Sequence, residues 1–143
     1  MSSSVKPDGW GMSRILIIED DPDMALGLAI PLEAQGHVLT FAATGEEGLQ
    51  KALEFAPDLI ILDVMMETGA TGFQVSLALR SPQPQSPYAA LRDTPILMLT
   101  ATHTTTALRF GPDEVYLPVD DFVEKPVDPD LLLAKVGALL AAR

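Results

Sequence analysis

Side chains that can bind a metal ion or a phosphoryl group follow four apolar, strand-length runs of this chain. They are Asp20 and Asp21 after the first run, Asp63 after the second, Thr100 at the end of the third and Lys125 after the fourth. Three carboxylates held together repel one another, and Mg²⁺, or Mn²⁺ in its place, relieves that repulsion through oxygen ligands. With a hydroxyl and an ammonium group nearby, such a site can attract a phosphoryl group. Asp63 is then the candidate nucleophile, which would form an acyl phosphate.

The runs that precede these side chains are typical of strands buried on both faces of a parallel sheet. Five strand patterns are present, at residues 14–18, 37–42, 58–62, 95–100 and 119–123. They alternate with helical patterns, which predicts an α/β domain with a doubly wound, five-stranded parallel sheet and helices on both faces. Open sheets of this kind bind ligands at the carboxyl ends of their strands, so the polar side chains are expected to converge at one edge.

Three helix starts are marked by residues that cap free backbone amides. Asp21-Pro22 and Asp128-Pro129 each predict one, because Asp accepts hydrogen bonds from first-turn amides and Pro suits the first helical position. Thr44 predicts a third, with a Glu three residues later. The residues of that helix expected to face the core are Leu49, Ala52, Leu53 and Ala56.

Prolines set two further expectations. Pro31 falls inside the first helix and should kink it or loosen its last turns. Three prolines within residues 82–87 exclude regular structure there and predict a surface loop at the edge opposite the polar side chains. A short helix is expected at 73–80 and a closing amphipathic helix at 131–140.

The composition suits one domain, because 143 residues with 48% hydrophobic content can bury a sizeable core. No apolar run approaches the roughly 20 residues that span a bilayer, so a cytoplasmic protein without membrane contact is expected. The absence of cysteine excludes disulfides and thiolate metal sites. A formal charge of -11 argues against nucleic-acid binding by this domain.

The domain is expected to cover residues 13–142. Residues 1–12 are polar and aperiodic, which is typical of a disordered leader or a cloning remnant.

Four short motifs stand in the order and approximate spacing of one known family. They are Glu19-Asp20-Asp21-Pro22, Leu62-Asp63-Val64-Met65-Met66, Leu99-Thr100-Ala101 and Phe122-Val123-Glu124-Lys125-Pro126. Over residues 13–142 the chain resembles the receiver domain of bacterial two-component response regulators. The resemblance implies a flavodoxin-like fold with strand order 2-1-3-4-5. It also implies a regulatory phosphoacceptor rather than an enzyme, with self-phosphotransfer and autodephosphorylation as the expected reactions.

The resemblance implies a role for each acidic residue. Asp63 would accept phosphate from a sensor histidine kinase or a histidine phosphotransfer protein. Asp20 and Asp21 would hold Mg²⁺ together with Asp63 and the backbone carbonyl of Met65.

The same resemblance implies how the phosphoryl group is bound and how the signal leaves the site. Thr100 and Lys125 would bind the phosphoryl oxygens, and Thr100 and Phe122 would form a conformational switch. Lys125-Pro126 would be a cis peptide, which is tolerable only before proline. The signal would pass to a downstream protein or to a domain absent from this chain.

Two segments depart from the family's pattern and leave other functions open. Residues 67–72 replace the usual Pro and Asp-Gly pair with one extra residue, and 102–118 carry consecutive threonines and prolines where the family has a helix. A degenerate receiver that acts as a phosphorylation-independent interaction module is therefore an alternative. A phosphohydrolase with an Asp nucleophile is a third, but its acid/base carboxylate is expected two residues after Asp63, where Met65 stands.

Overall fold

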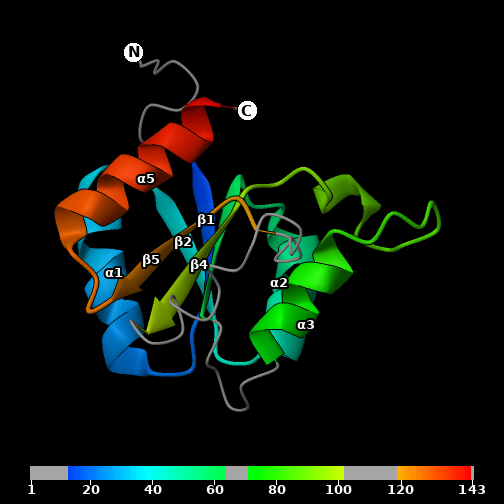
Figure 1. The fold of residues 1–143 in the computed structure, drawn as a ribbon, viewed down its shortest axis with the longest axis horizontal. Coiled ribbons are helices and arrows are strands. Elements are labelled where there is room, and N and C mark those ends of the chain that lie inside the picture. Colours follow the sequence, from blue (N-terminus) through cyan, green and yellow to red (C-terminus); the bar gives the residue numbers. More distant parts are fainter. Residues whose placement is uncertain (1–12, 64–70, 102–118, 143) are drawn as a thin grey trace, which may run out of the picture.

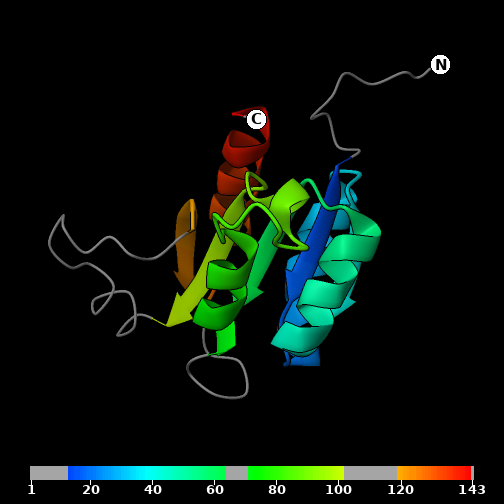
Figure 2. The same ribbon diagram turned by 90° about the vertical axis from the view of Figure 1, so that its right-hand side faces the viewer.

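The computed structural model describes residues 13–63, 71–101 and 119–142, and its centre is a five-stranded parallel sheet. The strands are β1 Arg14–Ile18, β2 Val38–Ala42, β3 Leu59–Asp63, β4 Ile96–Ala101 and β5 Asp121–Lys125. Their order is β2-β1-β3-β4-β5, and all four pairings are parallel (Figures 1 and 2). The predicted fold class and strand order are confirmed.

Helices cover both faces of the sheet, which is why the strands are apolar along their whole length. On one face lie α1 Pro22–Ala34 and α5 Pro129–Ala141, and on the other lie α2 Gly45–Phe55 and α3 Thr71–Leu79 (Figures 1 and 2). Alternate strand residues serve the two faces: in β1, Ile15 and Ile17 pack with α1 and α5, and Leu16 and Ile18 pack with α2 and α3. Two core layers thus fix the sheet from both sides.

The three predicted helix caps are all present. Asp21 accepts from the amides of Asp23 and Met24 at the start of α1, Asp128 accepts from Asp130 at the start of α5, and the Thr44 hydroxyl accepts from Glu47. Helix α1 runs to Ala34, past Pro31.

The prediction for the buried side of α2 was partly wrong. Ala52 is buried, but Leu53 is 48% exposed and Ala56 is the C-cap, in the left-handed conformation with φ 51°. Gly45 and Gly48 take the buried positions instead. A Cβ atom at Gly48 would lie 2.5 Å from Cδ1 of Ile18, so the missing side chain is what lets α2 approach β1 closely.

The proline-containing segment before β4 forms turns only, as predicted, and leads into a short 3₁₀ helix at Ala89–Leu91 that the sequence pattern did not indicate. Arg92 stabilises the proline-containing segment: its Nε donates to the Ser81 carbonyl at 2.7 Å, and its Nη2 donates to the Gln83 carbonyl at 3.0 Å. Because this segment precedes β4, it lies at the amino edge of the sheet (Figure 1).

Strand β5 begins two residues later than predicted, and Asp120, the residue before it, caps the start of β4. Its Oδ2 accepts from the Ile96 amide at 2.7 Å and pairs with Arg80.

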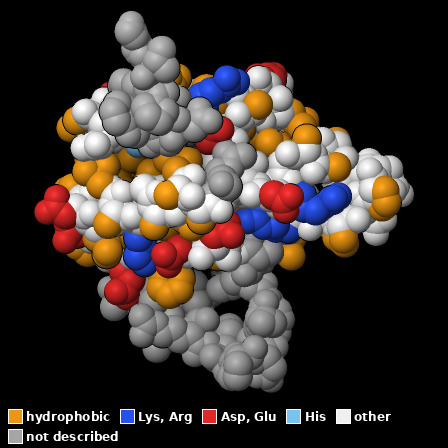
Figure 3. All heavy atoms as spheres, turned by 90° about the horizontal axis from the view of Figure 1, so that it is seen from above, with side chains coloured by type: hydrophobic (Ala, Val, Ile, Leu, Met, Phe, Trp, Pro, Cys, Tyr) orange, Lys and Arg blue, Asp and Glu red, His pale blue; other side chains and the backbone are white. Residues whose placement is uncertain are grey.

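On the face that Figure 3 shows, basic, acidic and hydrophobic side chains of the described residues lie interspersed. No helix in the described ranges has both the length and the apolar character needed to cross a membrane.

Candidate functional site

The sheet brings four strand ends together at its carboxyl edge. Because β1, β3, β4 and β5 are successive neighbours, the residues that close these strands lie beside one another. Asp63 is the last residue of β3 and stands opposite Leu99 of β4, and Ala101 stands opposite Lys125, the last residue of β5. The sequence-based expectation that these side chains converge at one edge is confirmed for Asp20, Asp63 and Lys125.

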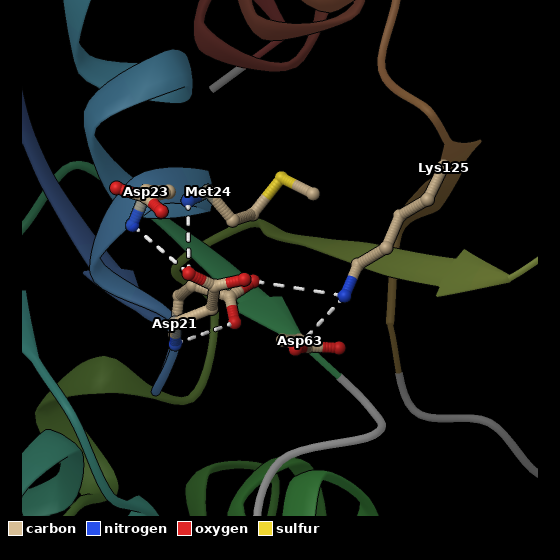
Figure 4. A network of polar contacts seen from close by, with 6 residues as sticks. Asp21, Asp23, Met24, Asp63 and Lys125 are labelled. Carbon is tan, nitrogen blue, oxygen red and sulfur yellow. Dashed lines mark hydrogen bonds and ion pairs between the residues drawn. The ribbon is translucent and has the colours of Figure 1, made fainter.

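Lys125 and Asp63 form a largely buried ion pair. Nζ of Lys125 lies 3.0 Å from Oδ2 of Asp63 and 3.7 Å from Oε1 of Glu19. Figure 4 shows the lysine side chain reaching from β5 toward Asp63 at the end of β3. Asp63 is only 2% exposed. Burial removes the Asp63 carboxylate from bulk water, and the Lys125 ammonium group balances its charge.

Three carboxyl groups form a compact acidic cluster. Oxygen atoms of Glu19, Asp20 and Asp63 lie within 4.8 Å of one another, and Asp20 is the exposed member. Glu19 Oε2 accepts from the Asp21 amide at 3.1 Å, whereas the buried Glu19 Oε1 accepts no hydrogen bond from the described residues and lies 3.7 Å from the Lys125 ammonium. A buried oxygen of this kind costs free energy unless it gains a partner. The donor set fits Mg²⁺, which prefers carboxylate oxygens and keeps several waters.

The pKa of the Glu19 carboxyl is raised to about 8. Burial is the main cause, and the neighbouring Asp63 carboxyl adds to it through a hydrogen bond and through its charge. The Asp21 amide and the Lys125 ammonium act in the opposite direction. Without a further cation, the site therefore favours the protonated, neutral form of Glu19 at neutral pH.

Asp21 was predicted as a metal ligand, and the structure does not bring it into this cluster. Its Oδ1 accepts from the amides of Asp23 at 2.9 Å and Met24 at 3.4 Å, as the N-cap of α1 (Figure 4). Glu19 takes the position that the prediction gave to Asp21. The sequence contained a signal for this, because the same Asp-Pro pair predicts a helix cap, and a capping carboxylate is turned toward the helix.

The remaining predicted residues are placed as follows. Thr100 is fully buried in β4, opposite Glu124. Phe122 is partly buried in β5, opposite Met98, and packs against the core layer of α2 and α3. The Lys125-Pro126 peptide is cis, as predicted. Met65 and the atypical segment 102–118 lie outside the described residues, as do residues 67–70 of the altered loop.

Comparison with known proteins identifies the family. The sequence profile of the response regulator receiver domain matches residues 15–137. The transcriptional regulatory protein AfsQ1 of Streptomyces coelicolor is 36% identical over 129 residues, which is 90% of this chain and 52% of that protein. The DNA-binding response regulator MtrA of Mycolicibacterium smegmatis is 35% identical over 89% of this chain and 50% of its own length. This chain thus spans about half the length of these curated relatives.

Solved structures agree with the sequence relatives. A putative response regulator from Chloroflexus aurantiacus is similar with a TM-score of 0.77 and 32% identity, over 91% of this chain and 98% of that one. The chemotaxis response regulator CheY4 of Vibrio cholerae has a TM-score of 0.73 and 30% identity, over 90% of this chain and 98% of that one. The chain belongs to the response regulator receiver domain family of two-component signalling.

Proposed function

We propose that Asp63 is the phosphoacceptor of this receiver domain and that Glu19, Asp20 and Asp63 hold the Mg²⁺ on which the reaction depends. The proposal rests on one observation: the buried Asp63 carboxylate lies 3.0 Å from the Lys125 ammonium and within 4.8 Å of the carboxyl groups of Glu19 and Asp20. The Met65 carbonyl would complete the metal ligands. Asp21 is not included, because its carboxylate caps α1.

The reaction is a transfer of one phosphoryl group. A carboxylate oxygen of Asp63 attacks the phosphorus of a phosphohistidine, an O–P bond forms, and the P–N bond breaks, so that the imidazole leaves. A bound Mg²⁺ supplies positive charge to the phosphoryl oxygens. Lys125 pairs with one of these oxygens, and the Thr100 hydroxyl donates a hydrogen bond to another.

The family is regulatory, and autodephosphorylation by hydrolysis of the acyl phosphate is proposed as the only other reaction of this domain. The phosphodonor would be a sensor histidine kinase or a histidine phosphotransfer protein. Two relatives are named as a transcriptional regulatory protein and a DNA-binding response regulator, and this chain matches about half of each. The signal would therefore pass either to a DNA-binding output domain on the same polypeptide or to a separate target protein.

Intact-mass spectrometry with acetyl phosphate tests this function. The wild-type protein is expected to gain the mass of one phosphoryl group when Mg²⁺ is present and to gain none in EDTA. Asp63→Asn keeps the size of the side chain but lacks the nucleophilic carboxylate, so it should gain no mass. Equal labelling of the wild-type protein and Asp63→Asn would contradict the proposal.

A further inference from the structure

Lys135 of α5 makes three contacts with Phe122 and with Asp121, the residue before it. Its Nζ donates to the Phe122 carbonyl at 2.7 Å and to Asp121 Oδ1 at 3.1 Å, and it lies 5.5 Å from the centre of the Phe122 ring. The lysine side chain is 26% exposed, so most of its stem is packed between α5 and β5. One ammonium group thus touches the main chain, the ring and the preceding carboxylate.

These contacts satisfy an edge of the sheet. Among the described residues β5 is the last strand in the order, so one row of its backbone groups has no neighbouring strand there. At Phe122 both of these groups are occupied, because the amide donates to Asp121 Oδ1 at 2.8 Å and the carbonyl accepts from Lys135. The main chain of Phe122 is therefore fixed by side chains, and the ring is attracted to the same ammonium group.

The position of Phe122 matters for the proposed site because the residue is built into the strand that carries Lys125. Phe122 stands opposite Met98 and Lys125 opposite Ala101, so a shift of the strand at Phe122 changes where the Lys125 ammonium lies relative to Asp63. Lys135 itself contacts neither Asp63 nor the acidic cluster by any interaction the structure shows among the described residues.

We propose that Lys135 is a positioning residue that holds Phe122 in the resting, unphosphorylated arrangement of β5 and so opposes the switch. The proposal rests on the function proposed for Asp63 and on the switch role that the family resemblance implies for Phe122. If the Lys135 contacts are stronger in the resting arrangement of β5 than in the activated one, they favour the resting arrangement by the difference between their free energies in the two states. Removing the ammonium group should therefore favour the activated arrangement.

The test uses ¹⁹F NMR of protein labelled with fluorophenylalanine, with the Phe122 resonance assigned through Phe122→Leu, and titration with beryllofluoride and Mg²⁺. Lys135→Met keeps the stem and removes the charge, and Lys135→Arg keeps the charge as the matched control. In metal-free Lys135→Met the Phe122 resonance should move toward its position in beryllofluoride-bound wild type. Its apparent affinity for beryllofluoride should rise by about fivefold or more, while Lys135→Arg stays within about twofold of wild type.

Two results would overturn the proposal. One is a Phe122 resonance in Lys135→Met that stays at the wild-type position while thermal stability falls, which is what a purely structural lysine would give. The other is an equal shift in Lys135→Met and Lys135→Arg. If Lys135→Met does not fold, Asp121→Asn replaces it, and this variant should move the resonance in the same direction by a smaller amount; no movement counts against the proposal.

Failure of the phosphoacceptor function would look different. In that case wild-type protein shows no response to beryllofluoride and Mg²⁺, while the comparison of the metal-free Phe122 resonance in Lys135→Met and Lys135→Arg still decides whether Lys135 holds the ring.

Discussion

Glu19 is a buried carboxyl group with a pKa of about 8, and it lies beside the proposed nucleophile. In the metal-free protein it keeps its proton at neutral pH, whereas its ordinary pKa of 4.5 applies in the unfolded chain. Between these two values the folded state binds more protons than the unfolded state. The contribution of Glu19 to the stability of the metal-free protein is therefore expected to fall as the pH rises from about 4.5 to about 8.

Glu19→Gln should remove this loss of stability, because the amide stays neutral at every pH. In EDTA at pH 8.5 the free energy of unfolding of the variant is expected to exceed that of wild type by roughly 1–3 kcal/mol, and near pH 5 the difference should be small. Urea unfolding at several pH values measures both proteins. Parallel pH profiles would show that Glu19 does not carry the raised pKa.

Magnesium affinity should depend on pH for the same reason. Mg²⁺ binds the ionised carboxylate, so binding must release the Glu19 proton below about pH 8. Isothermal titration should show Mg²⁺ affinity rising by up to about tenfold per pH unit between pH 6 and 8 and levelling above that. The slope should be much reduced in Glu19→Gln. An affinity independent of pH in wild type would argue against Glu19 as a ligand.

Asp20 and Asp21 are adjacent acids with different predicted effects, which makes them a matched pair. Asp20→Asn should weaken Mg²⁺ binding by about tenfold or more, because it removes the charge of the exposed cluster member. Asp21→Asn should leave Mg²⁺ affinity within about threefold of wild type, since Asn caps a helix about as well as Asp. Titration of both variants decides the ligand set, and a greater loss in Asp21→Asn would restore the original sequence-based assignment.

At the scale of single elements, local signals carried most of the prediction. The caps Asp21, Thr44 and Asp128 act within four residues of sequence, so their type and spacing were enough to locate three helix starts. The buried side of α2 was harder, because apolar periodicity counts large side chains and ignores glycine. Gly48 is buried because α2 lies close against Ile18, a distance set by the whole core.

Two helical glycines give a direct test of that close approach. Gly48→Ala places a methyl group 2.5 Å from Ile18 Cδ1 and should destabilise the protein by roughly 0.5–2 kcal/mol, the overpacking cost less the gain in helix propensity. Gly27→Ala in α1 meets nothing within 4 Å and should stabilise it by roughly 0.5–1 kcal/mol. Chemical denaturation gives both values. Stabilisation by both variants would mean that α2 does not depend on Gly48.

At the scale of the whole molecule, topology assembles the site. Asp63, Thr100 and Lys125 are far apart in sequence, yet each stands at or next to the end of a parallel strand, so the sheet order alone brings them to one edge. This part of the site could be predicted because strands buried on both faces are easy to recognise. Which two of three consecutive acids face the site could not be read from strand ends alone, because it depends on where β1 stops and α1 is capped.

The central claim is that Asp63 is the residue that takes the phosphoryl group. Borohydride reduction of protein treated with acetyl phosphate and Mg²⁺ converts an aspartyl phosphate into homoserine, and peptide mass spectrometry then locates it. Conversion at Asp63, dependent on Mg²⁺ and unaffected in Asp21→Asn, is the predicted result. Conversion at another carboxylate would contradict the account, and conversion at none would favour an interaction module that works without phosphorylation.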